Sequence, residues 1–146
     1  MYEVRNYKSN DWEEVDALWQ LTGMGGKERG DTAQTVERCN AAGGALFVML
    51  DKSLQKEKII GTLWLTNDGR RLYIHHCGLL PEYRGKGLSH KLLAPALKFA
   101  KEKNIQIKLE VHLDNTPARK LYAKYGFISF TDYDIRVIRD VKNLPF

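Results

Sequence analysis

The stretch that decides the fold reads Leu79-Leu80-Pro81-Glu82-Tyr83-Arg84-Gly85-Lys86-Gly87-Leu88-Ser89. It places two glycines between an apolar run and the start of a helical pattern. Such a turn lets backbone N–H groups converge with no Cβ in the way, and the helix start adds partial positive charge. Arg84 and Lys86 add full charges. The segment predicts a cradle for an anion, and a turn that serves packing alone is the alternative.

Apolar periodicity and turn residues predict regular elements on both sides of this turn. Strands are expected over 2–7, 45–50, 58–66, 71–80 and 105–112, with a last strand pair over 127–130 and 133–138. Helices are expected from a cap of Asn10 with Glu13, from a cap of Asp31 with Gln34, over 88–104, and from Thr116 to Gly126. Asn67-Asp68-Gly69 predicts a hairpin turn. Pro95 predicts a kink near Lys91 or strong tertiary support. The order is that of an α+β chain.

Length and composition predict one globular domain over residues 1–146 with no need for a disulfide or a structural metal. The net charge of +5 favours an anionic partner. No leader pattern or membrane-length apolar run is present, so we expect a soluble, cytoplasmic protein with no membrane partner. Cys39 and Cys77 stand far apart and have no companion ligand pair, which favours buried thiols over a metal site.

A second motif follows, Asn115-x-x-Ala118-x-x-x-Tyr122-x-x-x-Gly126-Phe127. With it, Arg84-x-x-Gly87-x-Ser89 resembles the Arg/Gln-x-x-Gly-x-Gly/Ala motif of the GNAT superfamily of acyl-CoA-dependent N-acetyltransferases. The likeness of element order covers nearly the whole chain. Ser89 departs from the pattern, but it still offers a backbone N–H, so only a slightly altered pyrophosphate contact is expected.

The resemblance implies a GNAT-like α+β fold, with a mixed, mostly antiparallel sheet of about six to seven strands and about four helices. The sheet would be split between the fourth and fifth strands, here 71–80 and 105–112, and the fourth would carry a bulge. The implied co-substrate is acetyl-CoA, with no metal. The backbone of Leu79 would bind the acyl carbonyl, and Asn115 would steady the pantetheine. The pyrophosphate would take the N–H groups of Arg84, Gly85, Lys86, Gly87, Leu88 and Ser89.

Acyl transfer to an amine needs a neutral amine, a polarised carbonyl and a proton for the leaving thiolate. Histidine suits the base role near neutrality, and His75 is the candidate because strand alternation puts it on one face with Cys77 and Leu79. His76 points the other way unless the bulge falls between the two. His75 also matches a position where some members of the superfamily carry a catalytic histidine. The alternatives are a hydrogen-bonded histidine within the sheet, or Glu110, His112 or a water relay as the base.

Tyr122 is the acid candidate, because its phenol can protonate a departing thiolate late in the reaction. The apolar stripe to which it belongs also allows a core tyrosine. The chain is therefore expected to be an N-acetyltransferase that moves an acetyl group from acetyl-CoA to a primary amine by direct attack in a ternary complex. The acceptor would be a small molecule or a peptide, and a homodimer stays open.

The same residues allow three other interpretations. They are a catalytically weak CoA-binding module, a basic nucleic-acid-binding module suggested by the helix lysines, and a thiol enzyme built on Cys77 and His75. The lysines are spread over the solvent sides of two helices, so a solvated face explains them without nucleic acid. The loop over 23–30 would help to shape the acceptor cleft, but its glycines and mixed charges name no substrate. Trp64 and Tyr73 could line the same cleft or simply pack in the sheet.

Overall fold

The computed structural model describes residues 1–146 and contains one five-stranded sheet and four α-helices. The strands are β1 Tyr2–Asn6, β2 Ala45–Asp51, β3 Lys58–Asn67, β4 Arg71–Leu79 and β5 Gln106–Leu109. The helices are α1 Trp12–Thr22, α2 Ala33–Ala41, α3 Leu88–Lys103 and α4 Thr116–Lys124. Strand order follows the chain, with antiparallel pairing from β1 to β4 and parallel pairing of β4 with β5. The predicted α+β class and mixed sheet are confirmed.

The chain divides into two compact units, Met1–His112 and Leu113–Phe146. The first unit holds the whole sheet with α1, α2 and α3, and the second holds α4. Each unit is described by itself.

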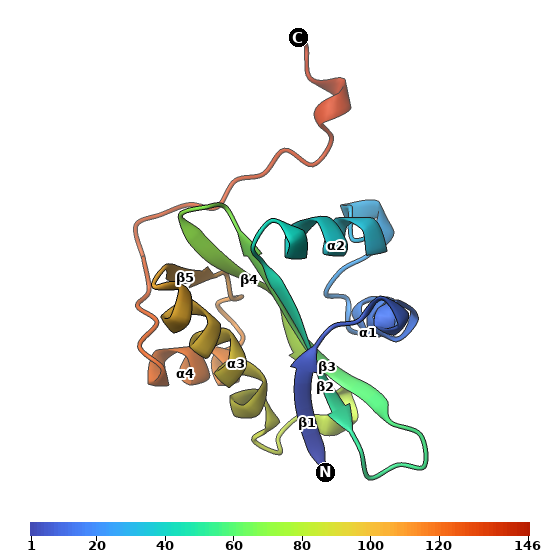
Figure 1. Cartoon of the computed structure of the whole chain (residues 1–146). Helices are drawn as coiled ribbons and strands as arrows, with labels where there is room; N and C mark the ends of the chain where they lie inside the picture. Colours follow the sequence, from blue (N-terminus) through green and yellow to red (C-terminus); the bar gives the residue numbers. More distant parts are fainter. The chain divides into compact units, whose positions relative to one another are not determined.

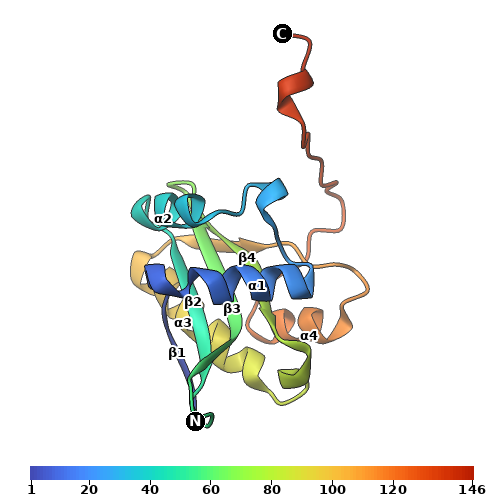
Figure 2. The ribbon, with the colours of Figure 1, turned by 90° about the vertical axis from the view of Figure 1, so that its right-hand side faces the viewer.

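Helices cover both faces of the sheet in the first unit: α1 and α2 lie on one face and α3 on the other (Figure 1). Figure 2 shows α1 crossing the strands. Because β3 has a helical layer on each side, its residues from Ile59 to Leu65 are all buried, whichever face they point to. β3 is therefore a central, buried strand of this unit, whereas β4 beside it is partly exposed.

The sheet has five strands rather than six to seven, because residues 127–138 form no strand pair. Alternation of apolar residues is present there, but a hairpin is stable only when one of its faces is covered. Ile128 is 81% exposed and Ile135 is 68% exposed, so this segment buries no apolar face that would hold two strands together.

The pairing of β4 with β5 is short. It runs from Arg71 opposite Gln106 to Ile74 opposite Leu109, and the rest of β4 continues to Leu79 without a β5 partner. The two strands are thus paired at one end only, at the place where the sequence predicts a split.

Three helices have caps one residue away from the predicted ones: α1, α2 and, as described below, α4. Asp11 stands at the N-cap of α1 in place of the predicted Asn10 and Glu13 pair, but its side chain does not cap that helix. Its carboxylate instead accepts the Lys8 N–H at 2.7 Å, at the start of the preceding 3-10 turn Ser9–Asp11. Thr32, not Asp31, caps α2, since its Oγ1 accepts the Thr35 N–H at 3.2 Å. Asp31 is drawn into a contact with the sheet instead, as described below.

Helix α3 matches the prediction and continues through Pro95 without interruption. The missing hydrogen bond is tolerated because the helix buries Leu92, Leu93, Ala96 and Ala100.

Among all helices of the chain, none combines the length and the apolar character that a membrane crossing would need.

Candidate functional site

A bulge interrupts β4 near its middle. The pairing of β4 with β3 shifts between Thr62 and Trp64, so that one β3 residue lies opposite two β4 residues, His76 and Cys77. His76 has a φ of +46°, in the left-handed region that residues other than glycine rarely adopt. Strained backbone of this kind persists only where the surrounding structure holds it in place.

The bulge corrects the predicted sharing of faces on β4. His75 pairs with Trp64 and Leu79 pairs with Gly61, three positions apart on β3, so the side chains of His75 and Leu79 lie on opposite faces. The extra residue is the physical reason. It also removes the premise of a thiol enzyme, because residues two apart do not share a face across a bulge. The His76 ring instead joins His75 on one face, with ring centroids 6.3 Å apart.

A buried threonine holds the bulge in place. Thr62 is fully buried on β3, and its hydroxyl donates to the His76 carbonyl at 2.8 Å. The same oxygen accepts the Trp19 Nε1–H from α1 at 2.9 Å. A hydroxyl can donate one hydrogen bond and accept others, so Thr62 is satisfied and links α1 to the strained residue.

Asp31 binds the side chain of His76. Its Oδ2 lies 3.0 Å from His76 Nε2 and also accepts the Gly26 N–H at 3.0 Å. A Cβ on Gly25 would lie 2.8 Å from His76 Nε2 and closer still to the Asp31 carboxylate. Only glycine lets the loop between α1 and α2 approach β4 this closely. A Cβ on Gly78 would likewise meet Met24 Sδ at 2.8 Å.

His75 has a different set of neighbours. Its Nε2 lies 2.8 Å from Thr66 Oγ1, and its ring stacks on Tyr73 with centroids 5.1 Å apart. The Tyr73 hydroxyl donates to Glu110 at 2.6 Å. Burial and Glu110 raise the pKa of Tyr73 to about 12, so this phenol stays a donor. Glu110 is therefore linked to His75 by hydrogen bonding only through Tyr73, and it acts on His75 directly through its charge.

Burial lowers the pKa of both histidines below the usual value. For His75 the neighbouring His76 adds to this effect, while Glu110 and Asp31 oppose it. For His76 the burial effect is opposed by the Asp31 carboxylate. Both imidazoles are therefore neutral at pH 7 and able to take up a proton.

Trp64, on β3, packs against both histidine rings and against Trp19. Its ring stacks on Trp19 at 5.5 Å and lies 5.9 Å from the His75 ring and 5.7 Å from the His76 ring. The side chain is 4% exposed, and its buried Nε1 has no hydrogen-bond partner within the protein. An indole N–H without a partner is costly in a buried site, so Nε1 is an unsatisfied donor within this cluster.

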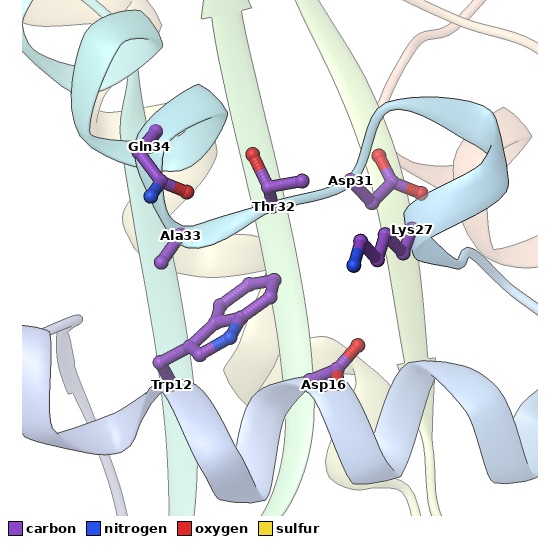
Figure 3. A pocket seen from close by; sticks show the side chains of 7 residues that line it. All are labelled: Trp12, Asp16, Lys27, Asp31, Thr32, Ala33 and Gln34. Atoms are coloured by element: carbon purple, nitrogen blue, oxygen red, sulfur yellow. The ribbon is translucent and has the colours of Figure 1, made fainter.

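A pocket of about 400 Å³ lies between α1 and the start of α2 (Figure 3). Asp16 and Lys27 bring opposite charges to it, and Asp31 belongs both to its wall and to the contact with His76. Its lining consists of Trp12, Asp16, Lys27, Asp31, Thr32, Ala33 and Gln34.

The glycine turn after β4 has the backbone that an anion cradle needs. Gly85 and Gly87 have φ values of +75° and +72°, and a Cβ at either would meet nothing within 4 Å. They are glycines for their backbone conformation and not for lack of room. Gly87 is the N-cap of α3 and, as a glycine, makes no side-chain cap hydrogen bond. Backbone N–H groups at such a helix start are suited to bind an anion.

At the end of β4, the backbone polar groups of Leu79 point away from β3. Leu80 N–H donates to Ile60 O at 2.8 Å, and neighbouring residues of a strand point their polar groups to opposite sides. The N–H and C=O of Leu79 therefore face the side on which β5 has already ended. Arg84 Nε donates to the Leu79 carbonyl at 3.1 Å, which ties the strand end to the glycine turn.

Asn115 and Tyr122 belong to the second unit. Asn115, rather than the predicted Thr116, is the cap of α4: its Oδ1 accepts the Ala118 N–H at 3.3 Å. Tyr122 lies on α4, with its ring 5.6 Å from Phe127 in an edge-on arrangement. Gly126, with a φ of +91°, follows the helix as predicted.

Solved structures share this fold over nearly the whole chain. A probable acetyltransferase from meticillin-resistant Staphylococcus aureus is 22% identical, with a TM-score of 0.71, and the match covers 96% of this chain and 100% of that one. Glucosamine-6-phosphate N-acetyltransferase from Arabidopsis thaliana is 17% identical, with a TM-score of 0.71 and coverage of 96% and 99%. A predicted acetyltransferase from Clostridium acetobutylicum, solved with acetyl-CoA, is 19% identical, with a TM-score of 0.71 and coverage of 94% and 96%.

At these identities the likeness concerns the fold, which is that of acetyltransferases. The family follows from the sequence match: residues 12–127 match the model of the Acetyltransferase (GNAT) family. The chain belongs to this family of acyltransferases, and the resemblance drawn from the two motifs is confirmed.

The sequence reasoning missed two residues of the histidine cluster. Asp31 was assigned to a helix cap, and Thr62 was not singled out. A usable signal lay in the glycines: Gly25 and Gly78 have no positive φ, so no turn explains them, and both permit a close approach of two chain segments.

Proposed function

We propose that this protein is an N-acetyltransferase that transfers an acetyl group from acetyl-CoA to a primary amine, by direct attack in a ternary complex. The observation that carries the proposal is the construction of β4. The strand carries two neutral histidines on one face. At Leu79 its backbone N–H and C=O point to the side where β4 has no partner strand, and the glycine turn follows. The proposed proton acceptor, carbonyl-binding N–H and anion cradle would thus follow one another along β4 and the turn after it.

The glycine turn fits a pyrophosphate. Gly85, Gly87 and the uncapped first turn of α3 offer backbone N–H groups, and Lys86 adds a charge. The N–H of Arg84 already donates to Pro81 O at 3.2 Å, so the cradle would run from Gly85 to Ser89, with Lys86 and Leu88 between them. Arg84 contributes its charge and its tie to Leu79. Asn115 is proposed to steady the pantetheine.

In the reaction the amine nitrogen bonds to the thioester carbonyl carbon, the C–S bond breaks, and CoA leaves as the thiol. An alkylamine with a pKa of about 10 arrives protonated, so a base must remove a proton. The two neutral histidines compete for this role. The face shared with Leu79, for which the sequence favoured His75, is absent because of the bulge. The Leu79 N–H is suited to polarise the carbonyl. Tyr122 is proposed as the donor of the proton that the leaving thiolate takes.

The test begins with binding. A thermal-shift titration with acetyl-CoA should raise the Tm, because a ligand present at 100 times its Kd stabilises the folded state by about 2.7 kcal/mol. Small-molecule amines, amino acids, polyamines and peptides are then screened for thiol release from acetyl-CoA. A titration without a concentration-dependent rise would count against the assignment. Binding without release from any amine would favour a CoA-binding module with weak or no catalysis.

A further inference from the structure

We infer that His76 is the proton acceptor of the proposed reaction and that Asp31 is its positioning residue. This inference rests on the proposed function and specifies its base. The two histidines share a face and are both neutral, so the choice between them depends on what each ring is bound to. The contacts of the two rings differ in kind.

The partner of His76 fixes the position of its proton. A carboxylate can only accept a hydrogen bond, so the contact between Asp31 Oδ2 and His76 Nε2 requires the proton to be on Nε2. Nδ1 then carries the lone pair that takes up a proton. The partner of His75 is the hydroxyl of Thr66, which can donate or accept, and it leaves the tautomer of His75 open.

Of the two rings, only His76 has a carboxylate in contact with it. When an imidazole takes a proton in a half-buried site, the resulting cation is best stabilised by an anion in direct contact. Asp31 lies 3.0 Å from the His76 ring and is itself held by the Gly26 N–H. Glu110 and Asp31 favour the protonated form of His75 through their charges, and Glu110 accepts its hydrogen bond from Tyr73.

The protein also orients His76 more strongly than His75. Its backbone is held in the left-handed region by Thr62, and its ring lies between Trp19, 4.6 Å away, and Trp64. Trp19 and Trp64 carry no charge. The ionisable groups that face His76 are therefore Asp31 and Arg29 from the loop and His75 from β4 itself.

The deciding experiment compares Asp31→Asn with Glu110→Gln. The first removes the carboxylate next to His76, and the second removes the one that reaches His75 through Tyr73. With an acceptor from the screen, Asp31→Asn should lower kcat/KM by about 100-fold, the lower end of what general base catalysis supplies. It should also move the acidic limb of the pH profile to lower pH, because the imidazolium loses its counter-ion. Glu110→Gln should leave that limb in place.

A second readout does not depend on activity. In protein labelled with ¹⁵N-histidine, long-range ¹⁵N–¹H correlations report the tautomer of each ring, with His76→Gln giving the assignment. The wild type should show His76 protonated on Nε2, and Asp31→Ala, which leaves no acceptor next to Nε2, should lose this fixed tautomer. Asp16→Ala removes the same charge from the same pocket without a contact to His76 and should leave the tautomer unchanged.

An unchanged tautomer in Asp31→Ala, together with an unchanged acidic limb in Asp31→Asn, would overturn the inference. A shift of the limb in Glu110→Gln instead would assign the base to His75. A wild type that does not bind acetyl-CoA would overturn the proposed function, and the tautomer would still test the pairing of Asp31 with His76.

Discussion

The glycine turn from Arg84 to Ser89 and the histidine face of β4 follow one another along the chain but are built in different ways. The turn is local, since its shape comes from two left-handed glycines and the start of the helix that follows. The histidine face is assembled from distant residues. Asp31 stands 45 positions from His76, and Thr62 stands 14 positions from it.

Under the proposed function, this difference separates cofactor binding from catalysis within the first unit. A backbone cradle accepts any anion of suitable shape and tolerates variation of its side chains. A histidine whose tautomer is fixed by a distant carboxylate depends on the loop between α1 and α2 staying in contact with β4. Changes in the turn should therefore act on binding of the CoA moiety, and changes in the loop should act on turnover.

The largest effect is expected for Gly87→Glu. A side chain strains the backbone at a φ of +72°, and the added carboxylate repels a pyrophosphate at the start of α3. The thermal shift with acetyl-CoA should disappear, and activity with it. Gly69→Glu is the matched control, because Gly69 has a φ of +86° and equally open surroundings in the turn between β3 and β4. A Gly87→Glu variant that keeps its thermal shift would remove the turn from the cofactor site.

Gly25→Ala tests the histidine face of β4. The new methyl group would collide with Asp31 and His76, so the loop must move away from β4. We expect kcat to fall by about 1000-fold, within the range of general base catalysis, with the acetyl-CoA thermal shift retained. Gly26→Ala is the neighbouring control, since its methyl group would meet only the flexible end of the Glu28 side chain, and it should keep most of the activity. Joint loss of binding and turnover in Gly25→Ala would contradict the separation of the two regions.

Tyr122→Phe asks whether the second unit takes part in turnover. Removal of the phenol should lower kcat by about 100-fold, as for loss of a general acid, while the affinity for acetyl-CoA stays the same. Tyr125→Phe, on an exposed neighbour, is the control. Single-turnover rates that match the wild type would exclude Tyr122 from the mechanism.

The smallest expected effect concerns stability. The pKa of His75 and of His76 is lowered in the folded state, so the unfolded chain binds more protons below pH 6.5. Their contribution to stability is complete above that pH and is lost as the pH falls through the folded pKa values. Replacing both by glutamine should flatten the dependence of Tm on pH between 7.5 and 5. Each kcal/mol of pH-dependent unfolding free energy that is lost corresponds to about 3 °C in Tm. Parallel curves for the wild type and the double variant would contradict the shifts.

Local features of this fold could be predicted from the sequence. The glycine turn, helix α3 and the turn at Asn67 to Gly69 depend on neighbouring residues, and the structure has them where the sequence places them. Helix caps were wrong by one residue, because adjacent polar residues compete for the role and a distant contact decides. Asp31 is a suitable cap for α2, but its carboxylate contacts His76 instead, and Thr32 caps the helix.

Features that need long-range contacts could not be predicted in the same way. The alternation over 127–138 is genuine, yet Phe130 and Val137 remain exposed and no strand pair forms. In the candidate site, both histidines were visible in the sequence as possible bases. Their shared face depends on where the bulge falls, and the role of Asp31 depends on a contact across the whole first half of the chain.

The bulge in β4 also changes how this chain should be aligned with its relatives. A single extra residue joins the two halves of β4. It directs the two histidines to the face covered by α1 and Leu79 to the opposite face. Deleting one residue at His76 or Cys77 would restore simple alternation and rotate one half relative to the other by half a turn. Two sequences with the same histidines, leucine and glycine turn would then build different sites. A one-residue gap at this position therefore alters function as much as a substitution of a catalytic residue would.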